Sequence, residues 1–295
     1  MRDLTSVNAP VNAPINAPVS APINAPVSAP INAPVSAPIR EVFCSVQGEG
    51  PYVGARQAFV RFSGCNLKCK YCDTDHADSG ACDYEKVEGS GNFEEVPNLI
   101  STCRLEAMLR PFTKLHSVSL TGGEPLLHAD FIEKLDLSAP LYLESNMTLP
   151  DQARKVREKV AYVAGDFKLP EALRQISPEA REAHIENTIE CFRVLKKNTS
   201  RDCFCKIVVS RDTKPETVLL AAEAVAAYVS CVILQPETIT GSVKPAPGIA
   251  QAPVPSQMQT DTQASVQALI KLQNTMLELI DTRIIPQTHR MWGCL

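Results

Sequence analysis

The sequence predicts an α/β protein whose core is a partial (β/α) barrel of about six to seven mostly parallel strands. Short apolar segments rich in β-branched residues alternate with segments of helical periodicity between residues 57 and 288. This alternation is typical of βα units around a parallel sheet. Two irregular stretches, 76–96 and 238–261, interrupt it and are expected to be long surface loops. A barrel of this kind has its functional site at the C-terminal ends of its strands.

The individual elements follow from local composition. The segments predicted as strands are 57–63, 116–122, 140–145, 161–168, 204–210, 231–237 and 282–288. The segments predicted as helices are about 97–110, 128–136, 150–160, 178–197, 215–228 and 262–281. The helix near residue 178 has the clearest start, because Ser177 is a typical N-cap residue and Pro178 suits the first turn.

The N-terminal repeat is predicted to be a disordered tether. Proline recurs at every fourth position from Pro10 to Pro38. Each proline removes a backbone donor and disfavours helical geometry at the alanine before it, so the tract is expected to be extended and without a core. The chain is therefore divided into a low-complexity tract, 1–38, and one folded domain, 39–295. A docking arm for a partner is the alternative interpretation of the tract.

Composition excludes several classes of protein. The formal net charge of −4 predicts no broad electrostatic binding to nucleic acid. No apolar run approaches the roughly 18 residues that a membrane span needs, and no signal peptide is expected because the start lacks an apolar core. Most of the 11 cysteines lie in apolar segments, which is typical of reduced thiols in a cytoplasmic protein.

Three cysteines follow the first predicted barrel strand in "FSGCNLKCKYCDTDH". Cys65, Cys69 and Cys72 have the spacing C-x3-C-x2-C. A redox disulfide would use only two of them, and a structural zinc site would need a fourth ligand that no nearby cysteine or histidine pair supplies. An iron–sulfur cluster held by three thiolates would leave one iron free for another ligand. The number three therefore favours the cluster.

The next predicted strand runs into "TGGEP", residues 121–125, where two glycines allow a close backbone approach. Together with the cysteines, this segment resembles the radical S-adenosylmethionine (SAM) superfamily. The resemblance implies a 4Fe-4S cluster whose open iron binds SAM, and a radical SAM partial-barrel fold. In such enzymes the reduced cluster cleaves SAM to a 5′-deoxyadenosyl radical, while the protein positions the reactants.

The resemblance is closer to one family within it. "FCSVQGEGPYVGARQAFVRFSGCNLKCKYCDTD", "TGGEPLL", "LESNMT", "DFKLP", "KIVVS", "LQPE" and "QTHRMWG" are similar to segments of the 7-carboxy-7-deazaguanine synthases. The implied reaction is that of a radical SAM lyase in queuosine biosynthesis. It converts 6-carboxy-5,6,7,8-tetrahydropterin to 7-carboxy-7-deazaguanine with loss of ammonia.

The resemblance also implies roles for individual residues. The metal ligands would be Cys65, Cys69 and Cys72 for the cluster and Thr74 for Mg²⁺. The substrate would contact Val46, Gln47, Gly48, Glu49, Arg61, Thr121, Glu144, His289 and Leu295. SAM would contact Tyr71, Asp73, Gly123, Asp166, Phe167, Lys168, Gln235, Pro236, Glu237 and Thr238. Catalysis would use no residue beyond the cofactor-derived radical.

Some of these roles have alternatives. Arg61 interrupts the apolar strand "AFVRFS", where its planar fork suits the pterin carboxylate; a structural salt bridge is the alternative. Thr74, taken alone, could cap the following turn. Many relatives have Ser-Pro-Lys in place of Asp166, Phe167 and Lys168, so the first two positions depart from the family pattern.

The resemblance further implies a homodimer that receives electrons from a donor such as flavodoxin or ferredoxin. Two other functions compete with the synthase. One is a glycyl-radical activating enzyme, which would use the same cluster and cofactor on a protein backbone. The other is an iron–sulfur redox sensor that recruits a partner through the repeat, but retention of the TGGEP and QPE segments argues against a sensor that binds no SAM.

Overall fold

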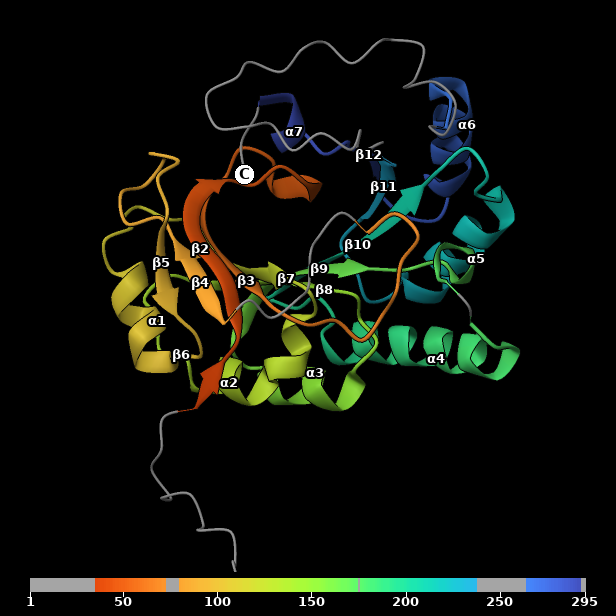
Figure 1. Cartoon of the computed structure of the whole chain (residues 1–295). Coiled ribbons are helices and arrows are strands. Elements are labelled where there is room, and N and C mark those ends of the chain that lie inside the picture. Colours follow the sequence, from red (N-terminus) through yellow and green to blue (C-terminus); the bar gives the residue numbers. More distant parts are fainter. Residues whose placement is uncertain (1–34, 73–79, 175, 238–263, 293–295) are drawn as a thin grey trace, which may run out of the picture. The chain divides into compact units, whose positions relative to one another are not determined.

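A ten-stranded sheet runs through the described part of the chain, in the order β12-β11-β10-β9-β8-β7-β3-β2-β4-β5. The computed structural model describes residues 35–72, 80–174, 176–237 and 264–292 (Figure 1). Residues from Pro34 onward belong to one compact unit. The functional cavity lies within this unit.

Consecutive parallel strands form the centre of the sheet. They are β3 (Arg56–Phe62), β7 (Ser117–Gly122), β8 (Leu141–Ser145), β9 (Val160–Asp166), β10 (Asp202–Val209), β11 (Val232–Pro236) and β12 (Thr282–Ile284). Each pairs in parallel with the next along this series. The α/β partial barrel predicted from the alternating pattern is therefore confirmed.

The sheet also extends beyond β3. Strand β2 (Ile39–Val46) pairs antiparallel with β3, β4 (Ala81–Tyr84) pairs parallel with β2, and β5 (Glu94–Pro97) pairs antiparallel with β4. The prediction of one long surface loop over 76–96 is thus wrong. Strand β5 reads Glu-Glu-Val-Pro and is mostly exposed at the sheet edge. Its sequence therefore lacks the apolar pattern that would indicate a strand. The second predicted loop, 238–261, lies outside the described residues.

The predicted helices are present with shorter bounds. They are α1 (Thr102–Leu109), α2 (Ala129–Lys134), α3 (Pro150–Val156), α4 (Pro178–Val194), α5 (Pro215–Val225) and α6 (Val266–Met276), followed by the short α7 (His289–Trp292). Ser177 caps α4 by accepting a hydrogen bond from the Ala180 amide, as predicted. Helices α2, α3 and α4 lie side by side against the sheet (Figure 1).

Successive side chains of β10 point to opposite faces of the sheet, and this separates the site from the main apolar core. Cys203, Cys205 and Ile207 are buried in the large apolar cluster shared with the helices. Phe204 belongs to a second apolar cluster on the opposite face of the sheet, and Lys206 lies two residues further along that same face. Side chains on this inner face therefore line the barrel, and polar ones there are available to a ligand.

The N-terminal repeat lies outside the described residues up to Pro34. Its last residues do form structure, because β1 (Ser36–Ala37) pairs antiparallel with β6 (Ile100–Ser101). Ala37 is fully buried there. Among the described helices, none is both long enough and apolar enough to cross a bilayer.

Candidate active site

One cavity at the C-terminal ends of the parallel strands gathers most of the predicted site residues. The predicted residues that line it are Val46, Gln47, Gly48, Glu49, Arg61, Cys65, Cys69, Tyr71, Cys72, Thr121, Gly123, Glu144, Asp166, Lys168, Gln235, Pro236, Glu237 and His289. Segments from both ends of the sequence thus meet around a single space. This is the location that the barrel architecture predicts.

Five predicted residues are not part of this lining. Asp73, Thr74, Thr238 and Leu295 lie outside the described residues. Phe167 is described, but its side chain is buried in the apolar cluster beneath the helices. Its backbone amide donates to the Lys206 carbonyl at 2.8 Å, so Phe167 continues the pairing of β9 with β10.

The cysteine loop begins directly after β3 and is fixed by the segment that follows β9. The Lys70 amide donates to the Ala172 carbonyl at 2.9 Å, and the Arg174 amide donates to the Lys68 carbonyl at 2.9 Å. Cys69 lies between these bonds, in an isolated antiparallel bridge with Leu173. The position of the middle cysteine therefore depends on the segment that also contains Lys168.

The two glycines of "TGGEP" pack against this loop. A Cβ atom on Gly123 would lie 1.7 Å from the Gly64 carbonyl oxygen, and Gly122 has a φ of +106°. The Gly123 amide donates to the Phe62 carbonyl at 2.9 Å, and the Glu124 amide donates to that of Gly64 at 2.9 Å. The close approach that the sequence predicts is therefore made to the chain's own cysteine loop.

The three cysteines suit an iron–sulfur cluster. All three line the same cavity, and none of them forms a disulfide. Burial raises the pKa of Cys65 and, to about 11, that of Cys69, so iron binding would have to displace their protons. No three cysteine, histidine or acidic side chains among the described residues converge on a single ion. A four-iron cluster does not require such convergence, because its thiolates bind separate iron atoms.

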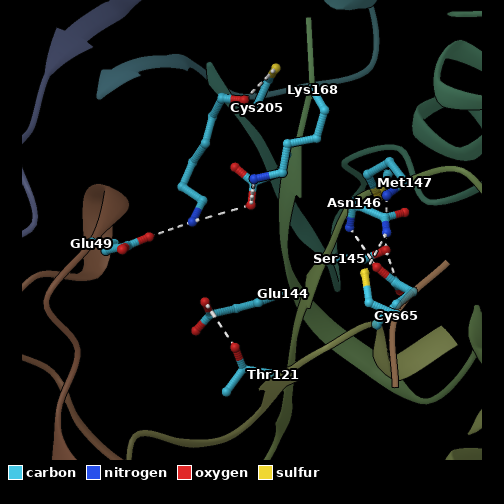
Figure 2. A network of polar contacts seen from close by, with 12 residues as sticks. Glu49, Cys65, Thr121, Glu144, Ser145, Asn146, Met147, Lys168 and Cys205 are labelled. Atoms are coloured by element: carbon cyan, nitrogen blue, oxygen red, sulfur yellow. Dashed lines mark hydrogen bonds and ion pairs between the residues drawn. The ribbon is translucent and has the colours of Figure 1, made fainter. Parts of the chain in front are cut away.

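Two hydrogen-bond donors are directed at the sulfur of Cys65, the first of the three cysteines. The Leu67 amide lies 3.5 Å from the Cys65 Sγ atom, and Asn146 Nδ2 lies 3.9 Å from it. Asn146 is held in this orientation because Nδ2 also donates to Asn66 Oδ1 at 2.8 Å, while its Oδ1 accepts from the Thr148 hydroxyl at 2.6 Å. Figure 2 shows Asn146 beside Cys65. Such donors stabilise a thiolate, which is the form that binds iron.

Glu124 fixes the backbone at Asn146, the residue whose side chain points at Cys65. Its carboxylate accepts from the Asn146 amide at 2.7 Å, the Ser145 hydroxyl at 2.8 Å and the Leu126 amide at 2.9 Å. Burial raises the pKa of Glu124 to about 7. The acid of "TGGEP" therefore ties the end of β7 to the end of β8.

A second polar group lies deeper in the cavity, around Glu144. Its Oε1 accepts from the Ser119 hydroxyl at 2.7 Å and from Gln47 Nε2 at 3.1 Å. Its Oε2 lies 3.5 Å from the Thr121 hydroxyl (Figure 2). Gln47 in turn donates to Gln57 Oε1 at 2.9 Å. These bonds orient the carboxylate toward the cavity that it lines.

A chain of alternating charges crosses the cavity above this group. Lys206 forms ion pairs with Glu49 and, at 3.7 Å, with Asp166 Oδ2. Lys168 Nζ lies 3.2 Å from the same Asp166 oxygen, and 5.2 Å from the centre of the Tyr71 ring. Figure 2 shows Glu49 at one end of this chain and Lys168 near the other.

Electrostatics keep these groups charged. Burial alone would raise the pKa of Glu49, but the Lys206 ammonium and a 2.7 Å hydrogen bond from Gln287 lower it to about 2. Burial would lower the pKa of Lys206, but Asp166 and Glu49 raise it well above its ordinary value. Each charged group in the series Glu49, Lys206, Asp166 and Lys168 therefore lies beside a group of opposite charge.

Arg61 shows features of both of its predicted roles. It lines the cavity, as an anchor for a carboxylate would. It also forms an ion pair with Glu41 on β2, and its guanidinium lies 5.4 Å from the centre of the Phe43 ring. The salt bridge holds the arginine in place, and the side chain still faces the cavity.

Several lining residues were not predicted from the sequence. They are Phe59, Leu67, Gly122, Ser145, Asn146, Lys206, Val208 and Gln287. Lys206 had a detectable signal, since it interrupts the apolar strand "FCKIVVS" as Arg61 interrupts "AFVRFS". Gln287 directly precedes the "TH" of a segment already singled out. Asn146 lies in "LESNMT", another segment already singled out, but its role could not be predicted because it depends on a loop 80 positions earlier in the chain.

Comparisons with known proteins agree with this geometry. The sequence profile of the Radical SAM superfamily matches residues 59–225. A 7-carboxy-7-deazaguanine synthase from Archaeoglobus fulgidus is 38% identical over 253 residues, which cover 86% of this chain and 96% of the relative. Enzymes of the same name from Methanothermobacter thermautotrophicus and Geobacter sulfurreducens are each 33% identical, with the same two coverages.

The profile covers more than half of the chain, from within β3 to the end of α5. It includes the cysteine loop, the two glycines and the charged ends of β9 and β10. The relatives extend the similarity across 86% of the chain. The chain therefore belongs to the radical SAM superfamily and, within it, to the 7-carboxy-7-deazaguanine synthase family.

Proposed function

We propose that the protein is a radical SAM lyase that converts 6-carboxy-5,6,7,8-tetrahydropterin to 7-carboxy-7-deazaguanine and ammonia, in queuosine biosynthesis. One observation carries this proposal beyond family membership. The cavity that contains the three cysteines also contains Glu144 and Arg61, a carboxylate and a guanidinium in one polar space. A carboxylated pterin needs both, because its pyrimidine edge donates hydrogen bonds and its carboxylate accepts them.

In this proposal the pterin is held by the inner face of the barrel. Glu144 accepts from the amino-pyrimidine edge, since Ser119 and Gln47 already fix its Oε1. Gln47, Glu49 and Gly48 on the loop after β2 line the same space. Arg61 takes the carboxylate, and Glu41 supports the guanidinium from behind. Holding a substrate in one reactive pose can contribute several kcal/mol to catalysis.

The cofactors are assigned to the opposite wall. Cys65, Cys69 and Cys72 hold the 4Fe-4S cluster, whose chemistry when bound is to supply the electron that cleaves SAM to a 5′-deoxyadenosyl radical. The chain's own part is to orient SAM with Asp166 and Lys168 at the end of β9 and with Gln235 at the end of β11. Gln235 is almost fully buried and its Oε1 has no hydrogen-bond partner among the described residues, so an unpaired acceptor faces the cavity that it lines.

The other parts of the proposal rest on the family resemblance. Thr74 would ligate Mg²⁺ through a hard oxygen donor, with substrate and water completing the shell. Reduction would come from flavodoxin or ferredoxin, and the enzyme would act as a homodimer. A cytoplasmic location suits the ten described cysteines, none of which forms a disulfide.

The test is anaerobic reconstitution with iron and sulfide, followed by assay with the carboxylated pterin, SAM and Mg²⁺. We expect 7-carboxy-7-deazaguanine and ammonia in equal amounts, measured by mass spectrometry and an ammonia assay. Cleavage of SAM without any deazaguanine product at every Mg²⁺ concentration would reject the synthase. The glycyl-radical activating enzyme would then become the better interpretation.

A further inference from the structure

Lys206 contacts the two walls of the cavity at once. Its side chain is 5% exposed, and its ammonium pairs with Glu49 on the loop after β2 and with Asp166 at the end of β9. A buried ammonium is stable only with such partners. Each carboxylate has one further donor, Gln287 for Glu49 and Lys168 for Asp166. Among the contacts of the described residues, the Lys206 ammonium is the group that these two carboxylates share.

We propose that Lys206 couples the two binding sites, so that the pterin and SAM each strengthen the binding of the other. This inference rests on the proposed function, because it assigns Glu49 to the pterin and Asp166 to SAM. Lys206 acts through these two carboxylates and is a positioning residue. Lys206 belongs to neither the cysteine motif nor the glycine segment.

The physical basis is the conformational entropy that is lost when Glu49, Lys206 and Asp166 become fixed, because the first ligand to bind bears part of this loss for the second. A ligand that fixes Glu49 also fixes the ammonium that Glu49 holds, and the ammonium then restrains Asp166. The second ligand meets a carboxylate that is already oriented and loses less conformational entropy on binding. Because the effect is a free energy between two sites, each ligand must change the affinity of the other by the same factor.

The experiment measures this factor directly. The reconstituted enzyme is kept anaerobic with its cluster oxidised, so that SAM and the pterin bind without turnover. Equilibrium dialysis gives the dissociation constant of SAM with and without saturating pterin, and that of the pterin with and without saturating SAM. In the wild type we expect both affinities to rise by the same factor, about 5-fold or more.

Three variants test the role of the ammonium. Lys206→Met keeps an unbranched chain without the charge, and the factor should fall to about one. Lys206→Arg keeps a cation that can reach both carboxylates and should retain coupling. Lys197→Met is the matched control, because Lys197 donates to the Val229 carbonyl away from the cavity. It should keep the wild-type factor.

The outcomes separate this inference from the proposed function. A folded Lys206→Met variant with a full cluster and the wild-type factor would overturn the coupling. So would a wild type that binds both ligands independently and still forms product. A wild type that binds no pterin and forms no product would overturn the synthase as well. If Lys206→Met does not fold, Glu49→Gln combined with Lys206→Met removes both charges of that pair, and coupling that survives in this double variant overturns the inference.

Discussion

Gly48 lies directly against His289. A Cβ atom on Gly48 would be 2.3 Å from the His289 Nδ1 atom and 2.5 Å from its Cβ atom. Next to this contact, the Thr288 amide donates to the Gly48 carbonyl at 2.8 Å. The loop after β2 and the segment after β12 therefore form one wall of the cavity, and both residues line it.

Replacing Gly48 with Ala should displace His289 from this wall. Because the clash involves the histidine Cβ atom as well as its ring, a rotation of the side chain cannot relieve it. We expect pterin affinity to fall by about 10-fold or more, and stability by about 1–3 kcal/mol as in other overpacked sites. SAM affinity without pterin should change little. Binding measurements on the reconstituted variant check this, and an equal loss for both ligands would contradict it.

Replacing Cys69 with Ala should remove the cluster. Its position is set by the bridge to Leu173, and Cys65 and Cys72 are the only other described cysteines that line the cavity. Iron content and the electron paramagnetic resonance of the reduced protein measure the loss. Cys103→Ala is the control, since Cys103 is exposed on α1, and it should keep full iron. A full cluster in Cys69→Ala would disprove the ligand assignment.

A pair of variants separates the two interpretations of Arg61. Lysine at this position keeps the charge but loses the planar fork, so pterin affinity should fall by about 10-fold while iron content and SAM binding persist. Glu41→Gln weakens the ion pair and leaves the guanidinium in the cavity. We expect this second change to cost stability more than affinity. If Glu41→Gln lowered pterin affinity as strongly as Arg61→Lys, the arginine would act mainly through the salt bridge.

Glu49 should make stability depend on acid pH. Its pKa is lowered to about 2 from an ordinary 4.5, so its ionised form is favoured in the folded state. This contribution is fully present above pH 4.5 and is lost as the pH falls toward 2. Each pKa unit corresponds to about 1.4 kcal/mol, so on the order of 3 kcal/mol is at stake.

The measurement compares urea unfolding of wild type and Glu49→Gln between pH 3 and 7. Both proteins are used without iron, since acid destroys the cluster. The wild type should be the more stable protein at pH 7, and the difference should shrink as the pH falls below 4.5. A difference that is constant with pH would show that Glu49 is not held in its ionised form.

Two N-terminal deletions should have different effects. Removing residues 2–34 should leave melting temperature and turnover unchanged, because the repeat cannot build a packed core. Removing 2–38 also deletes β1 and the Pro38 carbonyl, which accepts from the Ser63 amide at 3.0 Å just before the cysteine loop. We expect this longer deletion to cost roughly 1–3 kcal/mol, the usual penalty for a buried donor left unpaired. Thermal unfolding of both proteins compares them, and equal stability would show that β1 is dispensable.

The sequence predicted the parallel core because burial imposes a strong pattern there. Strands such as β10 alternate buried side chains on two faces, and their apolar composition shows this without any alignment. Strand β5 lies at the edge of the sheet, where most of its side chains are exposed and the pattern is absent, whereas β4 lies between β2 and β5 and has only four residues, two of them buried. An exposed edge strand such as β5 is therefore hard to detect from composition, but β2 and β4, inside the sheet, were not predicted either.

For the site, the sequence predicted many of the residues but not the contacts that orient them. Cysteine spacing alone indicated a cluster, and the roles of Glu144 and Lys168 came from the family resemblance. The contacts that orient these groups could not be predicted, because they join residues that are distant in sequence. Gln47 and Glu144 are 97 positions apart, and Lys206 and Glu49 are 157 apart. A charged residue inside an apolar strand is the one local signal that would have found Lys206.

The contact between Gly48 and Thr288 has a consequence for how the enzyme is made. The two residues are 240 positions apart, whereas the cysteine loop, the two glycines and Lys168 all precede α4. During translation the ribosome thus completes the wall that contains the cluster ligands well before the wall that His289 closes. A nascent chain would be able to acquire iron before it could bind a pterin. The cluster ligands would thus be available for iron before the pterin side of the cavity exists.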